Sequence, residues 1–129
     1  MALREAFEQS LADYHEVKVV FVDHPALVVP DGIRPDPGGV EIVLAAGGVE
    51  GALKGSLSPQ SLAGKTQTLV YGLDMPKPIS DLVIDDAGIH ATLSFGGLGW
   101  HKTFVPWEAV LGLRCEGERP KQRTKLRSV

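Results

Sequence analysis

The 129 residues include 13 Lys and Arg against 16 Asp and Glu, and 43% are hydrophobic, which suits one modest core in a soluble globular domain. No apolar run approaches the roughly 20 residues of a membrane-spanning helix. Arg4 and Glu5 also stand where a signal peptide would carry its apolar segment. These features predict one cytoplasmic domain without a membrane partner.

The charge is unevenly distributed along the chain. Residues 1–113 hold 7 Lys and Arg and 14 Asp and Glu, whereas residues 114–129 hold 6 and 2. An acidic body disfavours a broad phosphate-binding face, because nucleic-acid affinity comes largely from cationic contacts to the backbone. The lone cysteine, Cys115, excludes an internal disulfide, in agreement with a reducing compartment.

The chain begins with a predicted helix and strand. In residues 2–14, apolar side chains such as Leu3, Phe7 and Leu11 recur at helical spacing. They predict an amphipathic helix that rests on its own sheet or on a second copy. Residues 17–22 are dense in valine and predict a largely covered strand.

The middle of the chain predicts short strands and one insertion. Residues 47–65 are rich in Gly, Ser and Ala, with scattered leucines, which is typical of a surface loop. Proline and glycine breaks bound three further predicted extended stretches, at residues 26–29, 40–45 and 66–73.

Residues 82–105 predict three consecutive strands. After a short apolar run at 82–84, Asp85-Asp86-Ala87-Gly88 supplies residues suited to a tight turn. Apolar and polar side chains then alternate from 89 to 95, and Gly96-Gly97-Leu98-Gly99 reverses the chain into a strand at 100–105.

Closure of this hairpin at Gly97-Leu98 would set Phe95 opposite Trp100 and Ala91 opposite Phe104. The three aromatic side chains would then lie on the apolar face, and His101 would face Ser94. We expect Lys102 on that apolar face too, opposite Leu93, with its stem covering apolar surface.

The end of the chain divides into a last strand and a tail. Residues 106–111 are compatible with a strand or a helical turn, and we favour the strand. Residues 116–129 have almost no apolar content, so we expect a mobile basic tail after a domain at residues 1–115.

Signs of catalysis are weak. Ala63-Gly64-Lys65-Thr66 resembles the end of a phosphate-binding loop, but Pro59 replaces the required first glycine and has no amide hydrogen. The Asp85-Asp86 pair reads as a turn, and no nucleophile elbow occurs. The four histidines lack metal-ligand spacing: His15, His24, His90 and His101. We therefore expect no enzyme, cofactor or metal.

Small open β structures commonly present a groove or a sheet edge to an extended peptide. The rival interpretation is a small RNA-binding β-barrel module, since the tail is basic. In the predicted register, however, Phe95, Trp100 and Phe104 lie on the apolar face and leave no stacking platform. Nucleic acid is therefore the less favoured partner.

The order of the motifs resembles the stringent starvation protein B family of bacterial adaptors, which deliver tagged proteins to the ClpX unfoldase of the ClpXP protease. The resemblance rests on Phe95-Gly96-Gly97, on Val105-Pro106 and on Ala109-Val110-Leu111, preceded by a short strand between Pro25 and Pro30. It implies a mostly β (α+β) fold: an N-terminal helix that forms a homodimer, then a small, partly open antiparallel β-barrel-like body.

The resemblance also implies a function and its residues. A groove on the body would bind ssrA-like degron peptides, and a C-terminal tail would dock on ClpX, which tethers the substrate without any chemical step. The expected groove residues are Pro30, Ile33, Tyr71, Thr92, Ser94 and Phe95. The expected docking residues are Arg123, Leu126, Arg127 and Val129.

Overall fold

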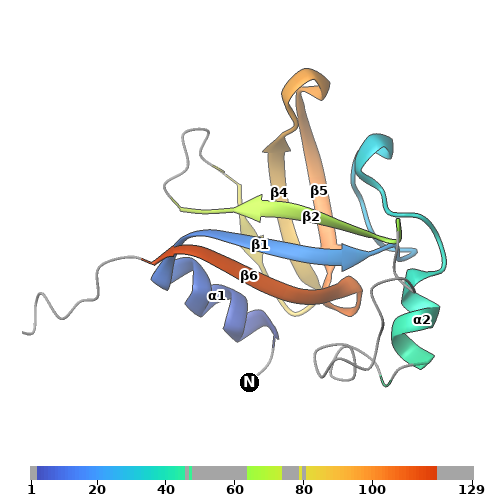
Figure 1. Ribbon diagram of the computed structural model, residues 1–129. Coiled ribbons are helices and arrows are strands. Elements are labelled where there is room, and N and C mark those ends of the chain that lie inside the picture. Colours follow the sequence, from blue (N-terminus) through green and yellow to red (C-terminus); the bar gives the residue numbers. More distant parts are fainter. Residues whose placement is uncertain (1–2, 46, 48–63, 74–78, 80, 119–129) are drawn as a thin grey trace, which may run out of the picture.

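A computed structural model describes residues 3–45, 47, 64–73, 79 and 81–118 (Figure 1). Its helices are α1 (Leu3–Asp13) and α2 (Gly39–Ala45), and its 3-10 turns are η1 (Asp31–Ile33), η3 (Gly96–Leu98) and η4 (Trp107–Ala109). Its strands are β1 (Tyr14–Val22), β2 (Thr66–Tyr71), β3 (Val83–Ile84), β4 (Gly88–Ser94), β5 (Trp100–Pro106) and β6 (Val110–Glu118). Neither described helix is long and apolar enough to cross a bilayer.

Two antiparallel sheets build the body, with strand orders β2-β1-β6 and β3-β4-β5. Their strands cross at a steep angle, and α1 lies along β6 and β1 (Figure 1). Among the described residues, the two sheets remain separate and do not close into a barrel. The predicted class, a mostly β and partly open fold behind an N-terminal helix, is confirmed.

The core lies between the two sheets and α1. Phe7 and Leu11 are buried, and the Phe7 ring meets Tyr71 and Trp107 edge-on at centroid distances of 5.3 and 6.2 Å. The apolar stripe of α1 is therefore covered within its own subunit. The largest fully buried side chains are Tyr71, Phe7, Phe21, Ile89, Val17, Val19, Val22, Val43, Val105 and Val110.

The strand predicted at residues 40–45 is wrong, because this segment forms α2. Its β-branched residues suggested a strand, but burial follows a helical period: Gly39 and Val43, four residues apart, are buried, whereas Leu44 is 67% exposed. A Cβ on Gly39 would lie 2.8 Å from the Val22 Cβ, so glycine allows α2 to approach β1.

The predicted strands 89–95 and 100–105 exist as β4 and β5, but their predicted register is wrong. The observed pairs are Ser94 with Trp100, Ala91 with Thr103 and His90 with Phe104. A one-residue shift moves every side chain of a strand to the other face. Trp100, Lys102 and Phe104 therefore lie outside, while Thr103 and Val105 point into the core.

The C-terminal prediction also needs correction. Residues 107–109 form a 3-10 turn, and β6 then runs to Glu118, pairing with β1 as far as Tyr14. Backbone pairing orders this segment despite its polar side chains, and Lys18 Nζ lies 2.8 Å from a Glu116 carboxylate oxygen. The predicted tail boundary at 116 is thus too early. Most of the predicted insertion and the four docking residues lie outside the described residues.

Candidate functional site

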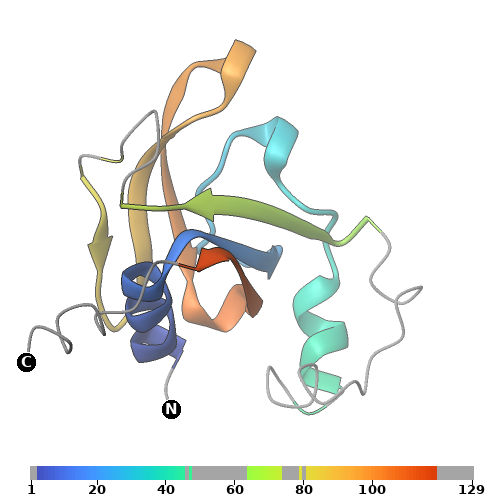
Figure 2. The ribbon, with the colours of Figure 1, turned by 60° about the vertical axis from the view of Figure 1, so that its left-hand side comes forward.

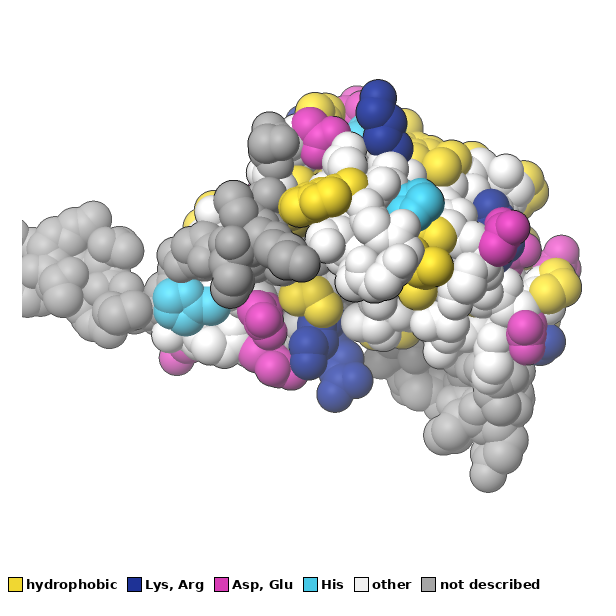
Figure 3. Space-filling view, turned by 90° about the horizontal axis from the view of Figure 1, so that it is seen from above, with side chains coloured by type: hydrophobic (Ala, Val, Ile, Leu, Met, Phe, Trp, Pro, Cys, Tyr) yellow, Lys and Arg dark blue, Asp and Glu magenta, His cyan; other side chains and the backbone are white. Residues whose placement is uncertain are grey.

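The outer face of the β4–β5 hairpin combines aromatic and polar side chains. It consists of His90, Thr92 and Ser94 on β4 and of Trp100, Lys102 and Phe104 on β5. The Trp100 side chain is 54% exposed. Seen from above the hairpin tip, hydrophobic side chains lie at the surface among scattered charged ones (Figure 3). A hollow of about 280 Å³, here called the outer hollow, is lined by Val28, Asp81, His90, Ala91, Lys102, Thr103 and Phe104.

The free edge of β5 borders the outer face. Val28 and Phe104 exchange two backbone hydrogen bonds of 2.9 Å, so the Phe104 backbone points away from β4. The backbone N–H and C=O groups of successive residues in an antiparallel strand point to opposite edges. Those of Lys102 and Trp100 therefore point away from β4, as those of Phe104 do. Within the described residues, the backbone groups of these two residues have no partner beyond β5.

Proline explains why the chain's own segment leaves this edge open. Continuing the register from Val28 and Phe104 by two residues would set Pro30 opposite Lys102. Proline has no N–H to donate to the Lys102 carbonyl. The edge beside Trp100 and Lys102 therefore keeps donors and acceptors that another extended chain could pair with.

The opposite edge of the hairpin is closed by a side chain. Thr92 donates twice to the Asp81 carboxylate, from its backbone N–H at 2.8 Å and from its hydroxyl at 2.6 Å. The hydroxyl bond, followed by the backbone bond, lowers the pKa of Asp81 below its ordinary value. The carboxylate itself remains exposed to solvent.

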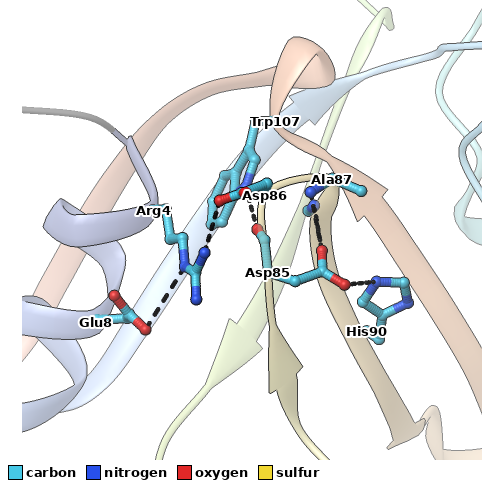
Figure 4. Close-up of polar contacts among 8 residues, drawn as sticks. Arg4, Glu8, Asp85, Asp86, Ala87, His90 and Trp107 are labelled. Carbon is cyan, nitrogen blue, oxygen red and sulfur yellow. Dashed lines mark hydrogen bonds and ion pairs between the residues drawn. The ribbon is translucent and has the colours of Figure 1, made fainter.

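The β3–β4 turn is held by Asp85, as predicted for this segment. Its carboxylate accepts hydrogen bonds from the N–H groups of Gly88 and Ala87, at 3.1 and 2.9 Å, and these two bonds lower its pKa. The second carboxylate oxygen lies 3.1 Å from His90 Nε2 (Figure 4). The His90 ring packs against the Phe104 ring, with 4.5 Å between the ring centroids. His90 is thus fixed on the outer face by partners on both sides.

Residues 30–33, here called the corner, lie beside the hairpin tip (Figure 2). A Cβ on Gly32 would lie 3.8 Å from Leu98 Cδ1, so the corner and the tip are neighbours. Arg34 anchors the corner because its guanidinium pairs with Asp23 and donates to the Leu27 carbonyl at 2.6 Å.

Replacing Arg34 with glutamine should loosen the corner. The change removes a partly buried ion pair with Asp23 and a charge-assisted bond to Leu27, so we expect unfolding to become easier by about 1–2 kcal/mol. Urea unfolding followed by circular dichroism measures the loss. The matched variant Arg114→Gln, at an exposed position on β6, should change stability by less than about 0.5 kcal/mol. Equal effects of the two variants would contradict the anchoring role.

A second hollow, of about 590 Å³, lies where α1 meets the β3–β4 turn. Arg4 bonds to Asp86 at 2.6 Å and lies 3.8 Å from Glu8, and the Trp107 indole donates to the Asp85 carbonyl at 2.8 Å (Figure 4). These contacts tie α1 to the second sheet. The lining residues are Leu3, Arg4, Glu5, Glu8, Asp86 and Trp107.

The structure brings together part of the predicted groove. Thr92 and Ser94 lie on the outer face, and Pro30 and Ile33 flank it at the corner, with Ile33 partly packed on the core. Phe95 precedes η3, also packs partly on the core, and lies 6.0 Å from the His101 ring.

The prediction that Tyr71 is a groove residue is wrong, because its side chain is fully buried. It packs against Phe7, and among the described residues no partner completes a hydrogen bond to its hydroxyl. Burial raises the pKa of this hydroxyl, and the nearby Thr103 hydroxyl opposes the shift without cancelling it. That Thr103 hydroxyl is itself bonded to the Ala91 carbonyl at 2.7 Å.

The sequence interpretation missed several residues that shape the outer face. The register error hid Trp100, Lys102 and Phe104, and the contacts of Val28 and Asp81 join segments far apart in the chain. A prediction with the correct loop length at the hairpin tip would have placed Trp100, Lys102 and Phe104 on the outer face. Among the described residues, no group of three or more His, Cys, Asp or Glu side chains is arranged to hold a metal ion.

Comparison with known proteins gives no match to a family model, to a curated protein or to a solved structure.

Proposed function

We propose that this protein is a non-enzymatic adaptor that binds an extended, ssrA-like degron peptide along the free edge of β5 and tethers its substrate to ClpX. The observation that carries the proposal is the pair of open backbone positions at Trp100 and Lys102, next to the corner. Each position offers one donor and one acceptor to an incoming strand.

The surroundings of the edge suit a peptide. A strand added about 4.8 Å from β5 would send alternate side chains over the outer face. There the exposed Trp100 and Val28 side chains supply apolar contact, and the outer hollow accommodates a side chain. Net affinity would depend mainly on aromatic contact, since each exposed hydrogen bond adds only about 0.5–1.5 kcal/mol.

Tethering is the second part of the proposal. Residues 119–129 lie outside the described part of the chain and include Arg123, Leu126, Arg127 and Val129, which match the docking pattern of the adaptor family. A tail held by ClpX would raise the local concentration of a bound substrate. The proposal includes a homodimer through α1, whose contact would use residues other than the buried Phe7 and Leu11.

Substitution of Trp100 tests the peptide site. A fluorescein-labelled peptide ending in Leu-Ala-Ala should bind the wild-type protein saturably, and Trp100→Ala should weaken binding by at least about tenfold, because it removes an exposed aromatic anchor. Fluorescence anisotropy measures both affinities. Leu44→Ala, which truncates a 67% exposed side chain on α2, should leave the affinity unchanged. Equal affinities of the two variants would place the peptide elsewhere.

Removal of the tail tests tethering separately. Deletion of residues 123–129 should abolish association with ClpX and leave peptide affinity unchanged, because the two sites are on different parts of the chain. Retained association with ClpX would exclude the tail as the docking segment.

Single-stranded RNA binding is a second candidate, favoured by one observation. The outer face carries the rings of Trp100, Phe104 and His90 beside Lys102. Such a row of rings could stack with bases, whereas the predicted register had placed the aromatic side chains on the apolar face. Asp81 and Asp85 border the same face and oppose phosphate binding. Salt-sensitive binding of an oligouridylate that is lost in Trp100→Ala, without binding of the peptide, would establish this candidate instead.

A further inference from the structure

We propose that Lys102 makes the free edge of β5 selective for peptides with an acidic side chain, Asp or Glu, at the residue that pairs directly with Lys102. The inference rests on the proposed peptide binding and goes further, because it assigns a chemical class to one side chain of the ligand. Lys102 is then a specificity-determining residue, distinct from the aromatic anchor at Trp100.

Lys102 lies on the strand that the peptide would join. Its side chain is exposed on the outer face and lines the outer hollow. Val28 pairs antiparallel with Phe104, so a peptide running in the same direction would set one residue opposite Lys102 and the next but one opposite Trp100. Directly opposite residues of antiparallel strands share a face, with Cβ atoms about 4.5–5.5 Å apart. The peptide side chain beside Lys102 would therefore contact it without crossing to β4.

The charge of Lys102 is available to a ligand. Among the described residues, Lys102 takes part in no ion pair. The carboxylate of Asp81, which lines the same hollow, accepts its hydrogen bonds from Thr92 instead. Those two bonds lower the pKa of Asp81 most, and the more distant charge of Lys102 lowers it least. A peptide carboxylate would thus gain an ion pair with Lys102 and break none.

The neighbours of Lys102 suit the stem of an acidic side chain. Val28, which is 50% exposed, and the half-buried Phe104 line the outer hollow next to it. They would cover the methylene groups of the incoming side chain and keep water from one side of the ion pair, which strengthens it relative to a fully exposed pair. A basic peptide side chain would be disfavoured, because like charges directly opposite on neighbouring strands repel.

A glutamate scan tests this selectivity. Labelled peptides of equal length end in Leu-Ala-Ala and carry one glutamate, moved through each internal position in turn, and fluorescence anisotropy gives their affinities. Since all these peptides have the same net charge, general attraction cannot distinguish them. We expect one position at which glutamate binds about twofold to fivefold more tightly than glutamine does, as for an opposite-charge pair across two strands.

Charge reversal assigns that preference to Lys102. Lys102→Glu should invert it, so that lysine at the same peptide position binds better than glutamate, and this binding would also show that the variant is folded. Lys102→Met, which keeps an apolar stem of similar length, should abolish the preference. Arg114→Glu reverses an exposed cation on a strand of the other sheet and should leave the preference unchanged.

The outcomes separate this inference from the proposed function. If the wild type binds the peptides but prefers glutamate at no position, the selectivity is overturned and the proposed function stands. A glutamate preference that persists in Lys102→Met has the same meaning. If the wild type binds none of the peptides, the proposed function fails and the selectivity with it.

Discussion

Gly88→Ala is expected to destabilise the protein by about 3–5 kcal/mol, which approaches the whole stability of a typical small domain. A Cβ at this position would lie 2.2 Å from the Val105 carbonyl oxygen and 2.8 Å from the Pro106 Cα. Both atoms belong to the backbone of β5, so no side-chain rotation relieves the overlap. Gly88 is also the residue opposite Pro106, where β5 ends.

Urea unfolding with far-ultraviolet circular dichroism measures this effect, and Gly97→Ala is the matched control. Gly97 lies in η3 at the hairpin tip, and a Cβ there would have no heavy atom within 4 Å. The control should change stability by less than about 1 kcal/mol. A Gly88 variant as stable as the Gly97 variant would contradict the close approach of β4 and β5 at this point.

Phe7→Ala should cost about 3–5 kcal/mol through loss of buried surface and the cavity that remains. Phe7 is fully buried and joins three elements, since its ring meets Tyr71 on β2 and Trp107 in η4 from its place on α1. Phe7→Leu keeps much of the volume and should recover more than half of the loss.

Thermal or urea unfolding of the three proteins measures these differences. Leu44→Ala again serves as the exposed control and should stay within about 0.5 kcal/mol of the wild type. If Phe7→Ala were no worse than Leu44→Ala, α1 would not be an integral part of the core. Such a result would instead favour a contact between the apolar stripe of α1 and a second copy of the chain.

Local patterns predicted most of the elements. The spacing of Phe7 and Leu11 and the alternation of Ile89, Ala91 and Leu93 depend on neighbouring residues alone, and both patterns are buried as predicted. The Asp85 turn is equally local, because the backbone N–H groups that its carboxylate accepts belong to Ala87 and Gly88, two and three residues along the chain. These features needed no knowledge of distant contacts.

The hairpin register depended on a choice that the sequence leaves open. Three glycines at the tip each tolerate positive φ, and the structure uses two of them, Gly96 at +60° and Gly99 at +80°. The Phe95 N–H then bonds to the Gly99 carbonyl, which gives a loop one residue longer than predicted. That single residue moved Trp100 and Phe104 onto the outer face and changed the candidate site.

Non-local contacts account for the remaining differences. A tyrosine, with its ring and hydroxyl, is a residue type that suits a peptide groove. Tyr71 is nevertheless buried, because Phe7 of α1 packs against it. The Asp81–Thr92 contact joins residues 11 apart across a strand edge, and the Val28–Phe104 bridge joins residues much farther apart. α2 forms against its β-branched composition because Gly39 permits close packing on Val22. None of these follows from periodicity.

Amide hydrogen exchange at Trp100 and Lys102 tests the central claim most directly, because that claim is that a peptide strand pairs with these two backbone positions. Saturation with the Leu-Ala-Ala peptide should slow exchange of both amides, while the Leu44 amide on α2 keeps its rate. Bound peptide with unchanged exchange at Trp100 and Lys102, or no binding at millimolar peptide, would contradict the account.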